Sequence, residues 1–280
     1  MTQPPSTAGP AQGAELPAPY GDSTGSLYHF DGRFYHPQPV TTGPWNPDAQ
    51  HGGPVAALLA GALEAGGGSA LVRMTVELLR PVPLRALSVE RRVVKSGRTV
   101  TLIDATISAG GVEVATARGL NLRRSDLAMA PKSTSFSPPI PSPQPAHAGA
   151  RRTAFAAAVE MRFVEGGWDE MGPATLWTRL RMPVVDHEPV TAMQRAAAAA
   201  DFANGISRVV DFETHTFINA DLTVAISRSP QDDWIGFEMA SHVSGQGTGH
   251  AESRIFDTAG TLGRSIQSLI VTEKALPADS

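Results

Sequence analysis

Residues 71–118 read LVRMTVELLRPVPLRALSVERRVVKSGRTVTLIDATISAGGVEVATAR, and residues 218–267 read INADLTVAISRSPQDDWIGFEMASHVSGQGTGHAESRIFDTAGTLGRSIQ. Both stretches contain strand-length segments of alternating apolar and polar residues, separated by an arginine-containing turn and a turn of small residues. The repeat predicts one fold used twice, in which one copy carries the chemistry and the other mainly packs. At an offset of about 149 positions, the alignment matches Arg80 with Arg228, Gly111 with Gly260, and Arg118 with Gln267.

The composition is that of a folded protein without a strongly charged surface. Its 280 residues are 41% hydrophobic, which is enough to bury one large core or two of ordinary size. The net charge is −4 and no Lys/Arg cluster is interleaved with aromatic residues, so we expect no nucleic-acid partner. The chain has no cysteine, which excludes disulfides, thiol nucleophiles and thiolate metal sites.

No segment of the sequence predicts a membrane span or an export signal. The longest apolar run, residues 54–63, is too short to cross a bilayer. The N-terminus has neither the basic region nor the apolar region of a secretion signal, so we expect a cytoplasmic protein. The histidines show no HExxH or paired ligand spacing, and we expect neither a metal nor a cofactor.

One helix is predicted in each half of the chain. The first, residues 54–65, follows a loop rich in Pro, Gly and Asn and ends at three glycines, residues 66–68. It is apolar on nearly every side, which favours a helix enclosed by a curved sheet. The second helix is expected from Pro189 to Phe202, with Asn204 and Gly205 closing it as a C-terminal cap pair.

The remaining segments predict strands around these helices. Prolines exclude helix and central strand from a Pro/Ser linker between the halves. A helix followed by a multi-stranded antiparallel sheet, found twice, is an α+β arrangement. Besides the strands of the first repeat, we expect strands at residues 27–35, 155–165, 175–183, 215–228, 234–244, 249–257 and 262–271.

Asp201 is the first candidate for chemistry. It follows five alanines at a helix end, where the helix dipole disfavours a negative charge. Gln194, Ala197 and Ala198 share a helix face with it, so close packing of the alanines on the sheet would draw the carboxylate inward. The alternative is that Asp201 lies at a frayed, hydrated helix end.

Asn219 and Gln267 are amides in strand segments that are otherwise half-buried. An amide can orient a water molecule or donate a hydrogen bond to a developing oxyanion, and a carboxylate can accept the proton of that water. Together with Asp201 they could position a hydrolytic water. Taken singly, each amide is more often a solvent-facing strand residue.

These residues lie in three short motifs: ADFANG at 200–205, FINADLTVAISRSP at 217–230 and GRSIQSLIV at 263–271. In these motifs the chain resembles the acyl-CoA thioesterase II family. That resemblance implies hydrolysis of acyl-CoA by a water that Asp201, Asn219 and Gln267 activate. Some relatives have Thr in place of the Asn, and the carboxamide keeps the donor and acceptor capacity of that position.

The resemblance also implies an α+β double-hotdog fold, with two antiparallel sheets each wrapped around a central helix. The expected organisation is a disordered tail at 1–25, an N-terminal hotdog at 26–125, a Pro/Ser linker at 126–150 and a C-terminal hotdog at 151–275. The acyl chain would lie between helix and sheet. Its depth would depend on side chains such as Met161, Phe163, Phe217 and Met239.

His51, Gly52 and Gly53 precede the first helix and resemble a Gly-Gly segment of the family. Small residues at a helix start let a ligand carbonyl approach free backbone N–H groups, so the three are candidate substrate contacts. The alternative is that they only form a tight loop.

Two other functions remain open. A hotdog hydratase would use an Asp and a His close together in sequence; Asp31 and His36 have that spacing but lie on the first expected strand. A catalytically silent protein could bind acyl-CoA or a lipid without releasing a thiol. Exposed sheet edges make a homo-oligomer plausible.

Overall fold

The two repeat units are joined by a pair of antiparallel strands, β3 (Ser69–Leu78) and β10 (Asp221–Ile226). Thr75 lies directly opposite Thr223, and their hydroxyl oxygens are 3.0 Å apart. These two threonines are 148 positions apart and occupy the same place in their repeats. A strand that pairs in this way with its own counterpart lies on a local two-fold axis, so the two halves face each other across this ladder.

The computed structural model describes residues 25–127, 132, 136–144 and 153–274. The expected disordered tail lies outside the described residues apart from Gly25, and so does much of the expected linker. In the described part, residues 136–144 form neither helix nor strand. They are held against the C-terminal half, where the Trp177 indole donates to the Pro138 carbonyl and the Gln144 amide donates to the Phe163 carbonyl.

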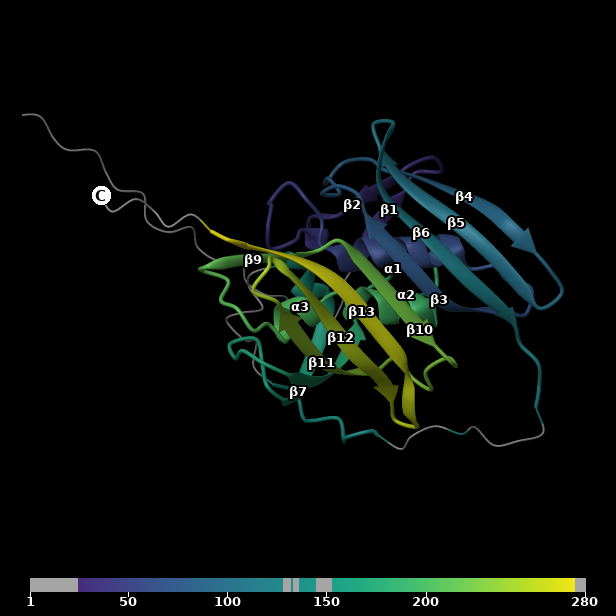
Figure 1. Ribbon diagram of the computed structural model, residues 1–280. Helices are drawn as coiled ribbons and strands as arrows, with labels where there is room; N and C mark the ends of the chain where they lie inside the picture. The colour runs from purple at the N-terminus through teal and green to yellow at the C-terminus, as the bar shows by residue number, and fades with distance from the viewer. Residues whose placement is uncertain (1–24, 128–131, 133–135, 145–152, 275–280) are drawn as a thin grey trace, which may run out of the picture.

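The ladder between β3 and β10 makes the sheets of both halves one antiparallel sheet of 11 strands within the described residues (Figure 1). The expected α+β class is confirmed, but the two expected sheets are joined edge to edge. The strand order is β4-β5-β6-β3-β10-β13-β12-β11-β8-β7, and β9 pairs with β13. The bounds are β4 (Ser88–Ser96), β5 (Val100–Ala109), β6 (Val112–Arg123), β7 (Val159–Glu165), β8 (Ala174–Leu180), β9 (His215–Asn219), β11 (Ile235–Val243), β12 (Thr248–Asp257) and β13 (Gly260–Glu273).

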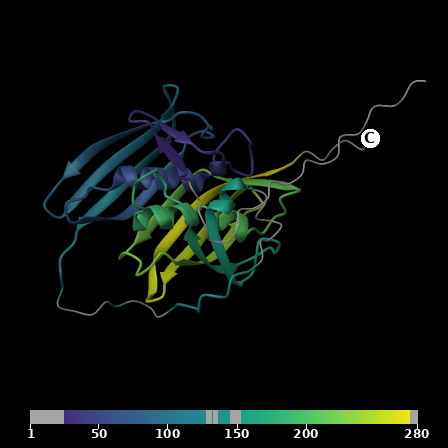
Figure 2. The same cartoon turned by 180° about the vertical axis from the view of Figure 1, so that it is seen from behind.

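Two helices, α1 (Gly52–Leu63) and α2 (Ala192–Ala200), lie against the same face of this sheet (Figures 1 and 2). They also pack on each other, because small residues let their backbones approach: a Cβ added at Gly53 would lie 2.5 Å from the Ala198 carbonyl oxygen. α1 is buried along almost its whole length, as its sequence predicted. α2 starts after a capping box formed by Thr191 and Gln194.

Several predicted boundaries were wrong for local reasons. Asn204 and Gly205 do not cap α2 but lie inside a short helix, α3 (Ala203–Ile206), and the Asn204 amide donates to the Phe217 carbonyl. The C-cap of α2 is Asp201. Residues 154–158, expected to be strand in part, form the 3-10 helix η3 (Ala154–Ala158).

Two long predicted strands are interrupted. The expected strand at 27–35 is a hairpin of β1 (Tyr28–Phe30) and β2 (Tyr35–Pro37), followed by the 3-10 helix η1 (Pro39–Thr41). The Asp31 carboxylate accepts backbone hydrogen bonds within the hairpin turn. The expected strand at 215–228 divides into β9 and β10 at Ala220.

The register also corrects the alignment of the two repeats. Arg118 on β6 lies opposite Thr75, and Ile266 on β13 lies opposite Thr223. Because the two threonines correspond to each other, Arg118 corresponds to Ile266. Gln267 then corresponds to Gly119, not to Arg118. An error of one residue reverses the face on which a strand side chain lies. Accordingly Arg118 is exposed, whereas Gln267 and Gly119 are buried on the face of the sheet that the helices cover.

A buried ion pair distinguishes the second repeat. Arg228 donates from its two terminal nitrogens to the two carboxylate oxygens of Asp257, each at 2.6 Å, and the Asp257 side chain is fully buried. Burial raises the pKa of Asp257, but Arg228 and two backbone N–H groups outweigh it and hold the pKa below its ordinary value. The residue in the first repeat that corresponds to Asp257 is Ala109, so Arg80, the counterpart of Arg228, has no such carboxylate.

We predict that Arg228→Met lowers the free energy of unfolding by about 3 kcal/mol or more, because it leaves a buried carboxylate without its cation. Arg80→Met, at the matched exposed position, should cost less than about 0.5 kcal/mol. Urea denaturation at neutral pH measures both. The pKa of Asp257 is lowered, so its stabilising contribution is lost as the pH falls through that pKa, and the deficit of Arg228→Met should narrow in acid. A deficit that is equal for the two variants would contradict this account.

Candidate functional site

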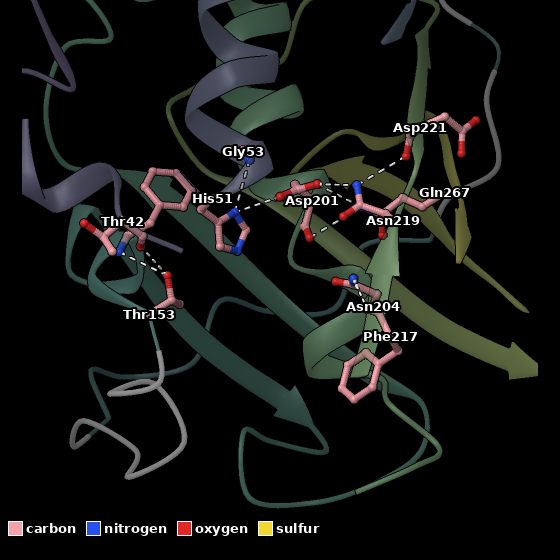
Figure 3. A network of polar contacts seen from close by, with 11 residues as sticks. Thr42, His51, Gly53, Thr153, Asp201, Asn204, Phe217, Asn219, Asp221 and Gln267 are labelled. Atoms are coloured by element: carbon pink, nitrogen blue, oxygen red, sulfur yellow. Dashed lines mark hydrogen bonds and ion pairs between the residues drawn. The ribbon is translucent and has the colours of Figure 1, made fainter. Parts of the chain in front are cut away.

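Asp201 is a buried carboxylate at the junction of the two halves. It caps the C-terminus of α2 and is 3% exposed. Its Oδ1 accepts hydrogen bonds from the Asn219 amide at 2.8 Å and the Gln267 amide at 3.0 Å, and its Oδ2 lies 2.7 Å from His51 Nδ1. Figure 3 shows Asp201 between His51 on one side and the two amides on the other. The structure therefore brings together all three residues of the predicted catalytic set, and it places His51, a predicted substrate contact, against the same carboxylate.

His51 comes from the other repeat and is held by its surroundings. It is the N-cap residue of α1 and is 8% exposed, with its ring 5.1 Å from the Phe155 ring and 4.7 Å from the Phe202 ring. The Gly53 backbone nitrogen lies 3.1 Å from the same Nδ1 that contacts Asp201. Nδ1 cannot accept from Gly53 and donate to Asp201 at once. Because the shorter contact is to a carboxylate, which can only accept when ionised, we assign the proton to Nδ1.

Gly52 lets the carboxylate approach the start of α1. A Cβ added at this position would lie 2.7 Å from both oxygens of Asp201. The first backbone N–H groups of a helix have no partner within the helix and carry partial positive charge. The N-terminus of α1 thus offsets the unfavourable position of Asp201 at the C-terminus of α2, which resolves the question that the sequence raised about this carboxylate.

A cavity of about 390 Å³ opens at this carboxylate. His51, Gly52, Asp201 and Asn219 line it, whereas Gln267 and Gly53 do not. Large aromatic side chains form much of the remaining wall, among them Trp45, Trp168, Phe202 and Phe212. The side chains that the sequence suggested for pocket depth, Met161, Phe163, Phe217 and Met239, are not among the lining residues.

The two amides have different environments. Asn219 lines the cavity, and its amide nitrogen already donates to Asp201 and to the Asp221 carbonyl. Its open polar atom is therefore the carbonyl oxygen, which can accept a hydrogen bond from water but cannot stabilise an oxyanion. Gln267 is 1% exposed and donates to Asp201 on the side away from the cavity, and its own buried Oε1 has no hydrogen-bond partner among the described residues.

The matching end of the molecule lacks these groups. At the corrected offset, Leu71 corresponds to Asn219 and Gly119 to Gln267. A Cβ added at Gly119 would already lie 2.9 Å from Leu63 Cβ of α1, so that space is filled by the helix. The polar site is thus built at one end of the helix pair only.

The catalytic residues predicted from the sequence all lie in the second repeat. His51 was predicted only to contact the substrate. His51 and Asp201 are 150 positions apart and become neighbours because α1 starts where α2 ends. The only local signal was a His directly before two glycines at a helix start. The Asp/His pair that the hydratase alternative would use, Asp31 and His36, is in contact at 2.6 Å, but both side chains are substantially exposed and neither lines the cavity.

The described residues hold no group of three His, Cys, Asp or Glu side chains arranged to bind a metal ion. In the same part of the chain, no helix is both long enough and apolar enough to span a bilayer.

Comparison with known proteins identifies relatives of both halves. Residues 41–122 match the family model of the acyl-CoA thioesterase N-terminal domain, and residues 136–271 match that of the acyl-CoA thioesterase C-terminal domain. No curated protein matches the chain in sequence.

Three solved structures illustrate the likeness of fold. An acyl-CoA thioesterase II from Mycobacterium marinum has 15% identity and a TM-score of 0.64, over 82% of this chain and 92% of that one. A TesB protein from Mycobacterium avium subspecies paratuberculosis has 17% identity and a TM-score of 0.64, over 88% and 95%. A hot dog protein of unknown function from Alicyclobacillus acidocaldarius has 18% identity and a TM-score of 0.62, over 89% and 96%. The expected double-hotdog fold is confirmed.

We predict that the His51 ring is protonated on Nδ1 in the neutral form, against the usual preference of histidine for Nε2. NMR of ¹⁵N-labelled protein distinguishes the two tautomers by their ring nitrogen shifts. Asp201→Ala removes the acceptor and should return His51 to the Nε2 form, with Nδ1 then accepting from Gly53. An Nε2-protonated His51 in the unmodified protein would contradict the assignment.

Proposed function

Because this chain belongs to the acyl-CoA thioesterase family, we propose that it hydrolyses an acyl-CoA thioester with a water molecule activated by the Asp201–His51 pair. The observation that supports this most directly is the 2.7 Å contact between the His51 Nδ1 and the Asp201 carboxylate at the wall of the cavity. In a base held this way, the carboxylate fixes the tautomer and leaves the second ring nitrogen free to accept a proton.

The reaction can be written on these groups. The water oxygen bonds to the thioester carbonyl carbon while one of its protons passes to His51 Nε2, and the carbonyl electron pair moves to its oxygen. When that pair returns, the carbon–sulfur bond breaks and the thiolate takes the proton from His51. Asp201 stays ionised throughout and stabilises the imidazolium that forms between the two steps.

The remaining groups would position the reactants. The open carbonyl oxygen of Asn219 can accept the second proton of the attacking water. The Gly52 N–H, in the first turn of α1, is the donor best placed for the oxyanion because Gly52 lines the cavity and has no intrahelical partner. Gln267 would act through Asp201, whose orientation it fixes.

The proposal predicts that Asp201→Asn and His51→Gln each lower kcat for acyl-CoA hydrolysis by at least about a hundredfold, the usual share of a general base. The release of CoA thiol, followed with substrates of several chain lengths, measures this. Asp31→Asn is the matched control, since it removes a carboxylate in contact with a histidine at the surface, and it should leave kcat unchanged.

Two results would count against the proposal. Near-normal turnover in Asp201→Asn would remove the carboxylate from the mechanism. If the unmodified protein bound acyl-CoA and released no thiol from any substrate, the silent binding protein would be the better description.

A further inference from the structure

Arg80, at the mouth of the cavity, differs in its side-chain contacts from Arg228, its counterpart in the other repeat. Arg80 follows β3 by two residues, is exposed and lines the cavity. Its side chain forms no ion pair or hydrogen bond with any described residue. Arg228, at the same place in the second repeat, is bound at both terminal nitrogens to Asp257.

Two changes in the first repeat leave the Arg80 side chain without a partner in the described part of the chain. Ala109 stands where Asp257 stands in the second repeat, so the carboxylate is missing. Arg85 donates to the Ala109 carbonyl at 3.3 Å and lies over Gly110 in the following turn. In the second repeat Arg228 itself contacts the equivalent hairpin, through the Gly260 carbonyl at the start of β13. Arg85 therefore replaces the structural contact, and the Arg80 guanidinium is left facing the cavity mouth.

The exposed apolar residues that line the cavity together with Arg80 suit a pantetheine arm. Leu79, Ile218 and Ile270 line the same cavity and are 50%, 42% and 58% exposed. Exposed apolar side chains grouped at a pocket mouth usually mark a contact surface for a ligand. One exposed cation next to such a surface matches a ligand with an uncharged arm and an anionic end.

The distances are consistent with this. Leu78 N–H donates to the Ala220 carbonyl at 2.8 Å, so the end of β3 lies beside Asn219. The backbone bends after Leu78, where the Leu79 and Arg80 N–H groups both donate to the Val114 carbonyl, so Arg80 lies within roughly 7 Å of Leu78 and its side chain extends the reach. The arm from the thioester sulfur to the first phosphate has the length of about four residues, roughly 14 Å when extended.

We infer that Arg80 binds the phosphate at the end of the pantetheine arm, and so selects phosphorylated thioesters. The inference rests on the proposed function for the position of the thioester. A guanidinium is suited to the role because it stays charged and its paired N–H donors match phosphate oxygens. Coenzyme A and the 4′-phosphopantetheine group of a carrier protein share this phosphate.

The test compares the affinities of pantetheine, 4′-phosphopantetheine and coenzyme A by titration calorimetry at low salt. In the unmodified protein, we expect 4′-phosphopantetheine to bind about tenfold more tightly than pantetheine. Arg80→Gln should remove this advantage and weaken coenzyme A by a similar factor. Arg73→Gln is the matched control, because Arg73 is an exposed arginine on β3 that does not line the cavity, and it should keep the advantage.

The outcomes separate this inference from the proposed function, because binding is measured without turnover. If the protein bound coenzyme A through Arg80 but hydrolysed no thioester, this result would support the phosphate site and refute the proposed thioesterase activity. Equal phosphate preference in Arg80→Gln and the unmodified protein would overturn the inference. So would a loss confined to coenzyme A, which would assign Arg80 to the nucleotide, and so would a protein that binds none of the three ligands.

Discussion

The ladder between β3 and β10 is the constraint on which the rest of the structure depends. Thr75 and Thr223 face each other across a local two-fold axis, so the two sheets become one and the two helices lie against a common face. The start of α1 is thereby brought to the end of α2. The cap residues of those two ends, His51 and Asp201, then come into contact, although neither repeat could form this pair by itself.

The two-fold relation also shows how the copies have diverged. Around one end of the helix pair the sheet offers Asn219 and Gln267, and at the matching end it offers Leu71 and Gly119. The same contrast applies to the arginines, since Asp257 neutralises Arg228 whereas no described carboxylate pairs with Arg80. In each case one copy uses the position for packing and the other leaves a polar group near the cavity.

Much of the fold could be predicted from the sequence because apolar periodicity records burial directly. The alternation along β5 and β13 predicted both strands to within two residues. The all-round apolar character of α1 predicted the helix, but its bounds were wrong by two residues, because α1 begins at Gly52 and ends at Leu63. The errors arose where tertiary contacts decide. The one-residue error in the repeat alignment could not be detected from the sequence. Gly119 and Gln267 are both buried, but their side chains have nothing in common that would align them. The division of β9 from β10, and the place of Asn204 inside α3, depend on contacts made across the sheet.

Only part of the candidate site could be predicted from the sequence. Asp201 and the two amides lie in one repeat, and short motifs carry them. His51 lies 150 positions from Asp201, and only the packing of α1 on α2 shows that they meet.

A double-mutant cycle on kcat for acyl-CoA hydrolysis tests whether His51 and Asp201 act as one unit. We expect the double variant His51→Gln/Asp201→Asn to be no more than about threefold slower than the slower single variant, because the effects of residues that act as one unit are not additive. Losses that multiply in the double variant would show that the two residues act independently and would contradict this expectation.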